Sequence, residues 1–259
     1  MSSSASVQDF TSLLLPNTID YEREIKAPQG SDAWHEVRNK TIGSSEAAAV
    51  FPSNISKTVQ TAELRAKLRG EKRRAVSDYL QAMFDEGSRQ EPVLRRELEQ
   101  LTGFRIVETG IFMKKLPGND VALTASLDGI ALGGEPTNLR VLLTEFKWRC
   151  SHGDCGWGLD RNELGLTVWC QVQHQMRVVN CKRALVYSGS RSGKRRLWLV
   201  NWHDTYPFMW DAWFVFVTAD LNAPVRARNG TRVSVEKQLK QFRKESSREI
   251  PVPDRDPAC

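Results

Sequence analysis

One stretch, residues 141–148 (VLLTEFKW), constrains the fold more than any other part of the chain. Side chains alternate between the two faces of a strand, so Leu143, Glu145 and Lys147 would share one face. The other face would carry Leu142, Thr144, Phe146 and Trp148. The apolar start of this stretch indicates a central strand covered on both sides. A glutamate and a lysine on such a strand need each other, a metal or a charged substrate to offset their desolvation.

Helix and strand patterns surround this stretch. We expect helices at 59–69, 76–86, 92–101, 166–179, 206–220 and 235–244, and one that begins at Ser31. Strand-like runs lie at 105–107, 110–113, 121–125, 184–187 and 196–202. This order predicts an α/β fold with a central mixed β-sheet flanked by helices. We assign residues 31–221 to that domain, 1–30 to an N-terminal extension and 222–259 to a basic C-terminal extension.

Composition narrows the class of protein. Hydrophobic residues make up 40% of the chain, which excludes wholesale disorder. The net charge of +6 favours an anionic partner, nucleic acid before membrane. No apolar run approaches the ~20 residues that span a bilayer, and the N-terminus has no basic region typical of a signal peptide. The cysteines form no regular framework, which indicates reduced thiols in an intracellular protein.

Two local patterns have competing interpretations. Cys150, His152 and Cys155 lie close together, but no second ligand pair has zinc-like spacing, so we disfavour a structural zinc site. Asp128 belongs to an Asp-Gly pair, which in isolation usually marks a turn. Glu145 and Lys147 could form a structural ion pair instead of a functional site.

Glu91 heads an apolar stripe on its predicted helix. The other members of the stripe are Leu94, Leu98 and Leu101. A carboxylate in this position points toward the core or a cleft, and Gly87, one turn earlier, would permit close approach of another element. The alternative is an N-terminal glutamate, favoured by the helix dipole just before Pro92.

The helix at 166–179 carries an apolar stripe with amides at its edges. The stripe consists of Trp169, Val172, Met176 and Val179. Gln171 and Gln175 flank one edge, and Gln173 flanks the other. Such amides can hold a phosphate or a metal-bound water, but we expect Gln173 and Gln175 to be solvated.

Arg38 precedes a Gly-Ser-Ser turn at the start of an Ala-rich segment. Backbone N–H groups and hydroxyls at a helix N-terminus form a natural phosphate site, which a nearby arginine can complete. The alternative is a serine N-cap with Glu46 in the first turn.

Taken together, the motifs W-x3-R, GSSEA, G-x3-E, SLDG, EFK and QVQ-x2-M resemble those of the YqaJ/phage lambda exonuclease group of viral recombination nucleases. That group belongs to the PD-(D/E)xK nuclease superfamily, whose restriction-endonuclease-like core the resemblance implies here. The similarity runs from about Ser31 to about Tyr187. One departure is Leu127, where the family usually has proline. The segment at 151–167 has no counterpart among these motifs.

The resemblance implies a role for each matching residue. Asp128, Glu145 and the backbone carbonyl of Phe146 would bind Mg²⁺, for which Mn²⁺ can substitute, and Glu91 would complete the acidic cluster. Lys147 would orient or deprotonate the attacking water, and Gln171 would contribute to the catalytic pocket. The residues that would hold DNA phosphates are Arg38, Ser45 and Ser126, with Arg38 at the 5′-phosphate.

The activity so implied is Mg²⁺-dependent 5′→3′ degradation of linear double-stranded DNA from phosphorylated ends, which supplies single strands for recombination or repair. The partners implied are double-stranded DNA ends, a single-strand annealing protein and further copies of the chain, with a trimer as precedent. Two alternatives stay open: an endonuclease or DNA/RNA nuclease of the same superfamily, and a non-catalytic DNA-binding module.

Overall fold

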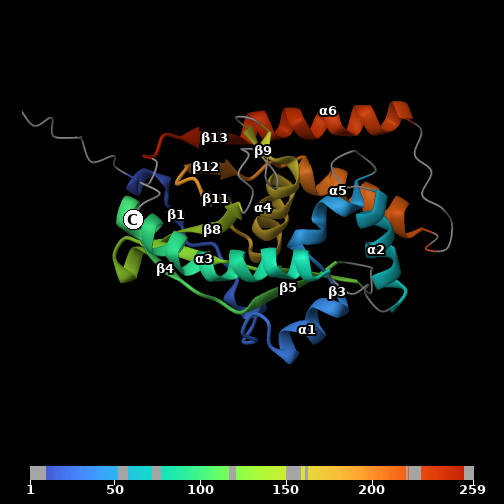
Figure 1. Ribbon diagram of the computed structural model, residues 1–259, viewed down its shortest axis with the longest axis horizontal. Coiled ribbons are helices and arrows are strands. Elements are labelled where there is room, and N and C mark those ends of the chain that lie inside the picture. The colour runs from blue at the N-terminus through green and yellow to red at the C-terminus, as the bar shows by residue number, and fades with distance from the viewer. Residues whose placement is uncertain are drawn as a thin grey trace, which may run out of the picture.

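The computed structural model describes residues 10–51, 58–71, 77–116, 121–149, 159–160, 163–219, 221 and 229–253 (Figure 1). The α-helices are α1 (Asp32–Asn39), α2 (Thr58–Leu68), α3 (Asp78–Thr102), α4 (Leu166–Val179), α5 (Tyr206–Thr218) and α6 (Asn229–Ser246). Short 3-10 helices lie at η1 (Thr11–Leu13), η2 (Tyr21–Arg23), η3 (Ser44–Val50) and η4 (Pro136–Asn138). Among the described residues, no helix is both long enough and apolar enough to cross a membrane.

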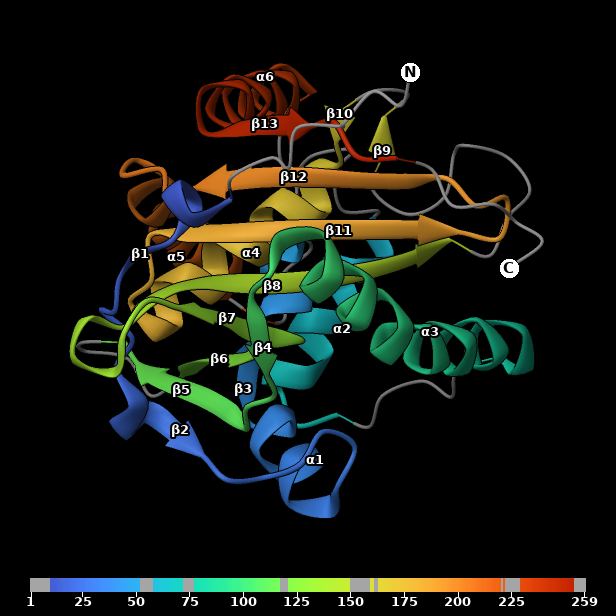
Figure 2. The same ribbon diagram turned by 90° about the vertical axis from the view of Figure 1, so that its left-hand side faces the viewer.

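A seven-stranded mixed sheet forms the centre of the fold, as the sequence predicts. Its strands are β13 (Ser247–Ile250), β12 (Arg195–Asn201), β11 (Arg183–Ser190), β8 (Arg140–Arg149), β7 (Gly129–Gly133) and β4 (Arg105–Val107), in that order, with β1 (Leu15–Pro16) also paired to β8. Strands β8 and β11 are parallel, whereas the other pairs are antiparallel. Figure 2 shows β12, β11, β8 and β7 side by side.

A second sheet has four strands, and the connection between β6 and β7 leads from it to the first sheet. Its order is β2 (Glu24–Ile25), β5 (Ile111–Lys115), β6 (Ala122–Ser126) and β3 (Thr41–Gly43). A separate pair consists of β9 (Leu159–Asp160) and β10 (Glu163–Leu164). Strand β6 ends at Ser126 and β7 begins at Gly129, so Asp128 lies where the chain passes from one sheet to the other.

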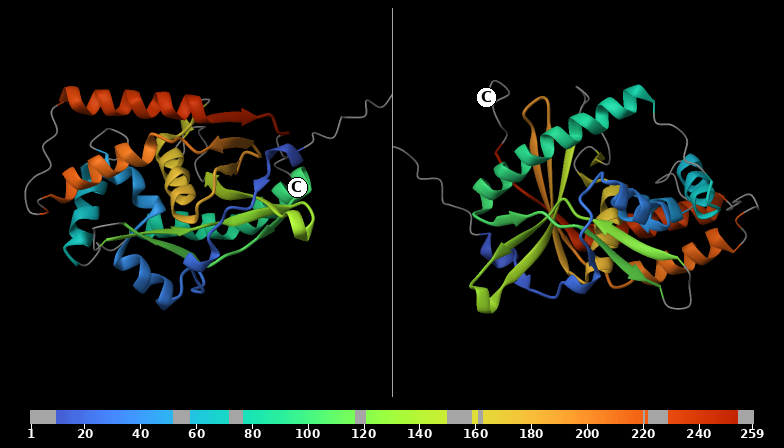
Figure 3. Two further views of the ribbon diagram at one scale, coloured as in Figure 1. Left: turned by 180° about the vertical axis from the view of Figure 1, so that it is seen from behind. Right: turned by 90° about the horizontal axis from the view of Figure 1, so that it is seen from below.

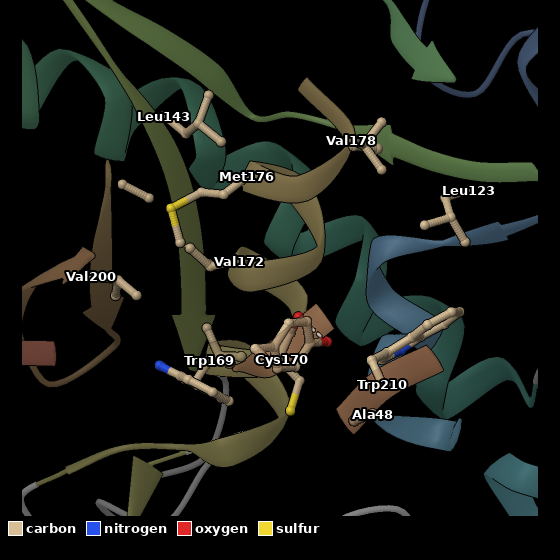
Figure 4. Packing of buried hydrophobic residues seen from close by; sticks show 14 of the residues in the cluster. Ala48, Leu123, Leu143, Trp169, Cys170, Val172, Met176, Val178, Val200 and Trp210 are labelled. Carbon is tan, nitrogen blue, oxygen red and sulfur yellow. Dashed lines mark hydrogen bonds between the residues drawn. The ribbon is translucent and has the colours of Figure 1, made fainter. Parts of the chain in front are cut away.

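Helices α3 and α4 cover opposite faces of the large sheet (Figure 3). On one face, Leu94 and Leu98 of α3 share a core cluster with Leu142 of β8. On the other, Val172 and Met176 of α4 pack toward Leu143 (Figure 4). The predicted alternation of side chains along β8 is therefore confirmed, and Glu145 and Lys147 lie on the α4 side.

Helix α3 corrects one expectation. The sequence predicted separate helices at 76–86 and 92–101, but α3 is one helix of 25 residues with Pro92 inside it. Proline removes one backbone donor, and burial of the apolar face in the C-terminal half of α3 offsets this loss. Because α3 begins at Asp78, Glu91 is not in the first turn. The helix-dipole interpretation of Glu91 is therefore wrong.

Two glycines near the acidic residues behave differently from expectation. A Cβ at Gly87 would meet nothing within 4 Å, so the predicted close approach at this position is wrong. Gly129 does not have a positive φ, so no left-handed backbone conformation requires a glycine after Asp128. Instead, a Cβ at Gly129 would lie 2.5 Å from Cγ2 of Ile106 and 2.8 Å from Oγ1 of Thr144. Gly129 therefore lets β7 pack closely enough to hold Asp128 beside β8.

We expect Gly129→Ala to lower the free energy of unfolding by about 1–3 kcal/mol, because the added methyl group overpacks the sheet. Gly87→Ala is the matched control, since it adds the same methyl group in open space on a helix. It should raise the free energy of unfolding by roughly 0.5–1 kcal/mol. Urea denaturation of both variants measures these changes, and equal stability of the two would contradict the packing argument.

Candidate active site

The predicted acidic residues meet at the junction of the two sheets. Asp128 is placed against β8 by a hydrogen bond in which the backbone N–H of Phe146 donates to Oδ2 of Asp128, at 2.7 Å. Glu145, which directly precedes Phe146, is 1% exposed. Pairing of Gly129 with Thr144 thus brings one carboxylate from the β6–β7 connection next to another from the central strand.

Both carboxylate oxygens of Glu145 accept hydrogen bonds. Nε2 of Gln171 lies 2.6 Å from Oε1, which also accepts from Nζ of Lys147. Oε2 accepts from Nε2 of Gln175, at 2.6 Å. Glu145 is therefore held by three donors, two of them from α4.

Glu91 approaches the same centre from α3. Its Oε1 accepts from NH2 of Arg95 at 2.9 Å, and the same nitrogen donates to the backbone oxygen of Asp128 at 3.0 Å. Arg95 also pairs with Glu108. Arg95 thus links α3 to the β6–β7 connection and holds Glu91 beside Asp128.

The carboxylates repel one another electrostatically. Loss of solvation, followed by the charges of Glu145 and Glu91, raises the pKa of Asp128 well above its usual value. Loss of solvation also raises the pKa of Glu91, and the charge of Glu145 adds to this effect. Burial alone would lower the pKa of Lys147, but the carboxylates around it raise the pKa above the ordinary lysine value. The alternative of a structural ion pair between Lys147 and Glu145 does not explain why Asp128 and Glu91 also lie close to Lys147.

The donor chemistry fits a hard divalent cation. Carboxylate and carbonyl oxygens are the ligands that Mg²⁺ and Mn²⁺ prefer, and a cation would relieve the repulsion between Asp128 and Glu145. Within the described part of the chain, no three Asp, Glu, His or Cys side chains form a metal-binding group by themselves. The predicted ligands are Asp128, Glu145 and the Phe146 carbonyl, with Glu91 completing the acidic cluster, and Glu91 pairs with Arg95 in this structure.

The three residues predicted to hold phosphates are connected by two hydrogen bonds and one cation–π contact. NH2 of Arg38 donates to Oγ of Ser45 at 3.0 Å, and its guanidinium lies 4.7 Å from the ring centroid of Trp34. Nε1 of Trp34 donates to Oγ of Ser126 at 3.3 Å. Helix α1 therefore carries both the arginine and the indole that connects it to the end of β6.

Glu46 and Gly43 set the position of Arg38. The N-cap of η3 is Gly43, whose N–H donates to Oε2 of Glu46 at 2.9 Å, so the alternative of a serine N-cap is wrong, although Glu46 does lie in the first turn. A Cβ at Gly43 would lie 3.0 Å from NH2 of Arg38, which shows how closely the guanidinium lies over this turn. Glu46 forms an ion pair with Lys67 of α2 at 2.7 Å. Burial works against ionisation of Glu46, but Lys67, the Gly43 N–H and Arg38 together outweigh it and lower the pKa.

The expectation that Gln173 and Gln175 are solvated is wrong, since they are 0% and 1% exposed. Gln173 donates to the backbone oxygen of Asn201 at 2.8 Å and accepts from the N–H of His203 at 3.0 Å. Gln175 faces the acidic centre. The amides flank an apolar stripe, which is typical of a helix edge, but contacts of Gln173 with the end of β12 and of Gln175 with β6 and β8 come from segments distant in sequence.

The Cys150, His152 and Cys155 cluster, like most of the segment at 151–167, lies outside the described residues.

Comparison with known proteins shows the family of this chain. The model of the YqaJ-like viral recombinase domain matches residues 33–182, more than half of the 259 residues. The chain belongs to this family. The matched region includes every site residue named above from Arg38 to Gln175.

Solved structures show the same fold. An alkaline exonuclease (LHK-Exo) from Laribacter hongkongensis is 18% identical, with a TM-score of 0.52, and the match covers 82% of this chain and 100% of that chain. The structure of LHK-Exo in complex with dAMP gives the same identity and coverage, with a TM-score of 0.53. No curated protein matches the chain at a significant level. The YqaJ-like family member therefore has the fold of an alkaline exonuclease.

Proposed function

We propose that this protein is a Mg²⁺-dependent exonuclease that degrades linear double-stranded DNA 5′→3′ from phosphorylated ends. The observation that carries the proposal is the position of Asp128, whose Oδ2 lies 2.7 Å from the Phe146 nitrogen, beside Glu145 and Lys147. This arrangement places two carboxylates and an ammonium group at one point on the surface of the sheet. Family membership and the exonuclease fold support a nuclease acting on DNA.

Each residue then has a chemical task. Asp128, Glu145 and the Phe146 carbonyl would hold the metal, and Glu91 would complete the acidic cluster. Mg²⁺ at such a site polarises a phosphate and acidifies a bound water. The ammonium of Lys147 donates to Glu145 and can orient the attacking water. It can also stabilise the negative charge that develops on the oxygen of that water as a proton is lost. Gln171 donates to the same carboxylate oxygen.

End recognition would rest on the Arg38 network. An arginine held over a glycine turn presents a fork of N–H donors that matches a terminal phosphate. Ser45 and Ser126 add hydroxyls to the same network. A phosphate bound there lies next to the β6–β7 connection that carries Asp128, so the first phosphodiester bond of the 5′ strand would be brought to the acidic centre.

The single strand left by such an enzyme is a substrate for recombination. An annealing protein that binds single-stranded DNA is the partner this activity implies. A ring of several copies, as in the trimeric precedent, would hold the duplex during successive cleavage steps.

The decisive experiment is digestion of linear duplex DNA labelled at either end, with Mg²⁺ or EDTA, and with 5′-phosphate or 5′-hydroxyl ends. Circular DNA and RNA serve as controls. Metal-dependent release from the phosphorylated 5′ end, with circles spared, is the expected result. Cut circles or RNA would instead favour the endonuclease or DNA/RNA nuclease, and DNA binding without cleavage under any metal would favour a binding module.

We expect Arg38→Ala to slow digestion of 5′-phosphorylated ends about 10-fold or more, because one charge-assisted pair contributes roughly 1.5–3 kcal/mol. Digestion of 5′-hydroxyl ends should change little. Lys40→Ala is the matched control, since it removes a neighbouring positive charge that pairs with Glu36 at 3.0 Å. Equal losses on both kinds of end would reduce Arg38 to a general phosphate contact.

A further inference from the structure

Gln175 occupies a position that the proposed activity does not yet explain. It lies on α4 one turn after Gln171, and its side chain is buried between the two sheets. Nε2 donates to Oε2 of Glu145 at 2.6 Å and to the backbone oxygen of Ser126 at 3.3 Å. One amide nitrogen therefore joins the central strand to the end of β6.

Both partners of this nitrogen are acceptors, so the position demands a donor. If the amide were reversed, Oε1 would face a carboxylate oxygen and a carbonyl oxygen, which repel it. In the observed orientation, Oε1 is buried and has no hydrogen-bond partner among the described protein atoms. The hydrogen bonds of Nε2 therefore fix the orientation of the Gln175 side chain. The buried Oε1 without a partner is unfavourable for the stability of the fold.

The two partners belong to different halves of the candidate site. Glu145 is a metal-binding carboxylate in the proposed function, whereas Ser126 belongs to the phosphate network through Trp34. The connection between the halves is continuous: Arg38 lies over Trp34, Trp34 bonds to Ser126, and Gln175 bonds to both Ser126 and Glu145.

We propose that Gln175 is a positioning residue that fixes the metal-binding orientation of Glu145 and couples it to the DNA-phosphate site at Ser126. The inference rests on the proposed function and deepens it. Hydrogen-bond partners of metal ligands orient those ligands, and their removal commonly lowers metal affinity about 10–100-fold. Gln171 shares Glu145 with Gln175 but does not contact Ser126 in any described hydrogen bond, so among the described residues Gln175 is the side chain that bonds to both Glu145 and Ser126.

The test compares Gln175→Met with Gln173→Met. Each variant replaces a buried amide by an apolar side chain of similar length, but Gln173 bonds only to the backbone near β12 and α5. Isothermal titration calorimetry with Mn²⁺, in the absence of DNA, measures the metal affinity directly. We expect about a 10-fold or larger loss for Gln175→Met and less than a 3-fold change for Gln173→Met.

The coupling is tested by thermodynamic linkage. Ca²⁺ binds oxygen ligands with less strict geometry than Mg²⁺, so it serves as the probe ion for binding of a short 5′-phosphorylated duplex. In the wild-type protein, bound Ca²⁺ should tighten duplex binding, and Gln175→Met should abolish most of this enhancement. Gln175→Glu keeps the shape but presents an acceptor, and should behave like Gln175→Met.

The outcomes separate the two proposals. Equal losses in Gln175→Met and Gln173→Met would show a merely structural role, and unchanged Mn²⁺ affinity in both Gln175 variants would overturn the positioning role. Unchanged linkage in Gln175→Met would overturn the coupling. If the wild-type protein binds Mn²⁺ but never cleaves DNA, the proposed function fails while the role of Gln175 toward the metal still stands.

Discussion

Lys147→Ala is expected to abolish cleavage of duplex DNA while leaving DNA binding largely intact. The Lys147 ammonium is held at Glu145 and is the cationic side chain that the ExK motif places beside the acidic centre. Loss of a group that orients or deprotonates the nucleophile typically slows a reaction about 10²–10⁴-fold. Single-turnover cleavage of an end-labelled duplex measures this loss, and a gel-shift titration with Ca²⁺ measures binding.

The ion pair with Glu145 requires a control for folding. Lys147→Ala removes one of three donors to Glu145, but Gln171 and Gln175 still donate to it. Circular dichroism should therefore show a folded protein with only a modest loss of stability. Lys182→Ala, at a lysine that lies over Trp202 away from the site, should retain full cleavage. Cleavage retained by Lys147→Ala would remove its catalytic assignment.

Much of the fold follows from patterns that are local in sequence. The alternation along β8 predicted both of its faces, and helix α4 ends at Val179 as its periodicity indicates. Ser31 caps α1 by accepting a bond from the N–H of Trp34. Strands β7 and β13 were not expected, because GIALG is short and glycine-rich and SREI is mostly polar. Strand β13 pairs with β12, and β7 pairs with β4 as well as with the adjacent β8, and these pairings with segments farther along the chain are not visible in a local pattern.

In the candidate site, too, residues in local motifs could be predicted, whereas contacts between distant segments could not. Motif order and family resemblance could identify Asp128, Glu145 and Lys147, since each residue belongs to a short segment with its own signature. Connections between segments could not be predicted. Gln175 was assigned to solvent because its neighbours on the helix surface are polar, yet β6 and β8 both lie against it. No sequence motif indicates a role for Arg95, since it donates to the backbone oxygen of Asp128, which any residue at position 128 would provide.

The acidic centre should also destabilise the protein whenever no cation is bound. The pKa of Asp128 is raised in the folded state, chiefly by loss of solvation and then by Glu145 and Glu91. The native state therefore holds this proton to higher pH than the unfolded state does. Stability from this group is present at low pH and is lost as the pH rises through the raised folded-state pKa.

Asp128→Asn is accordingly expected to abolish cleavage and, in EDTA at neutral pH, to make the protein more stable. The amide oxygen can still accept the hydrogen bond from the Phe146 N–H, while the charge that opposes Glu145 and Glu91 is gone. A gain of roughly 1 kcal/mol is the expected size for removal of a poorly compensated charge, which corresponds to about 2–4 °C in Tm. Thermal unfolding with EDTA and with Mg²⁺ measures both effects.

Asp85→Asn provides the comparison, because it neutralises an exposed carboxylate on α3 that accepts a bond from Gln81 at 2.8 Å. It should leave the Tm in EDTA, the stabilisation by Mg²⁺ and cleavage unchanged. In Asp128→Asn, the Mg²⁺-induced rise in Tm should disappear along with cleavage, since in the proposed function the carboxylate that causes the repulsion is also a ligand of the ion. A lower Tm in EDTA for Asp128→Asn would mean that Asp128 is satisfied by its protein neighbours, and the acidic cluster would then not require a cation.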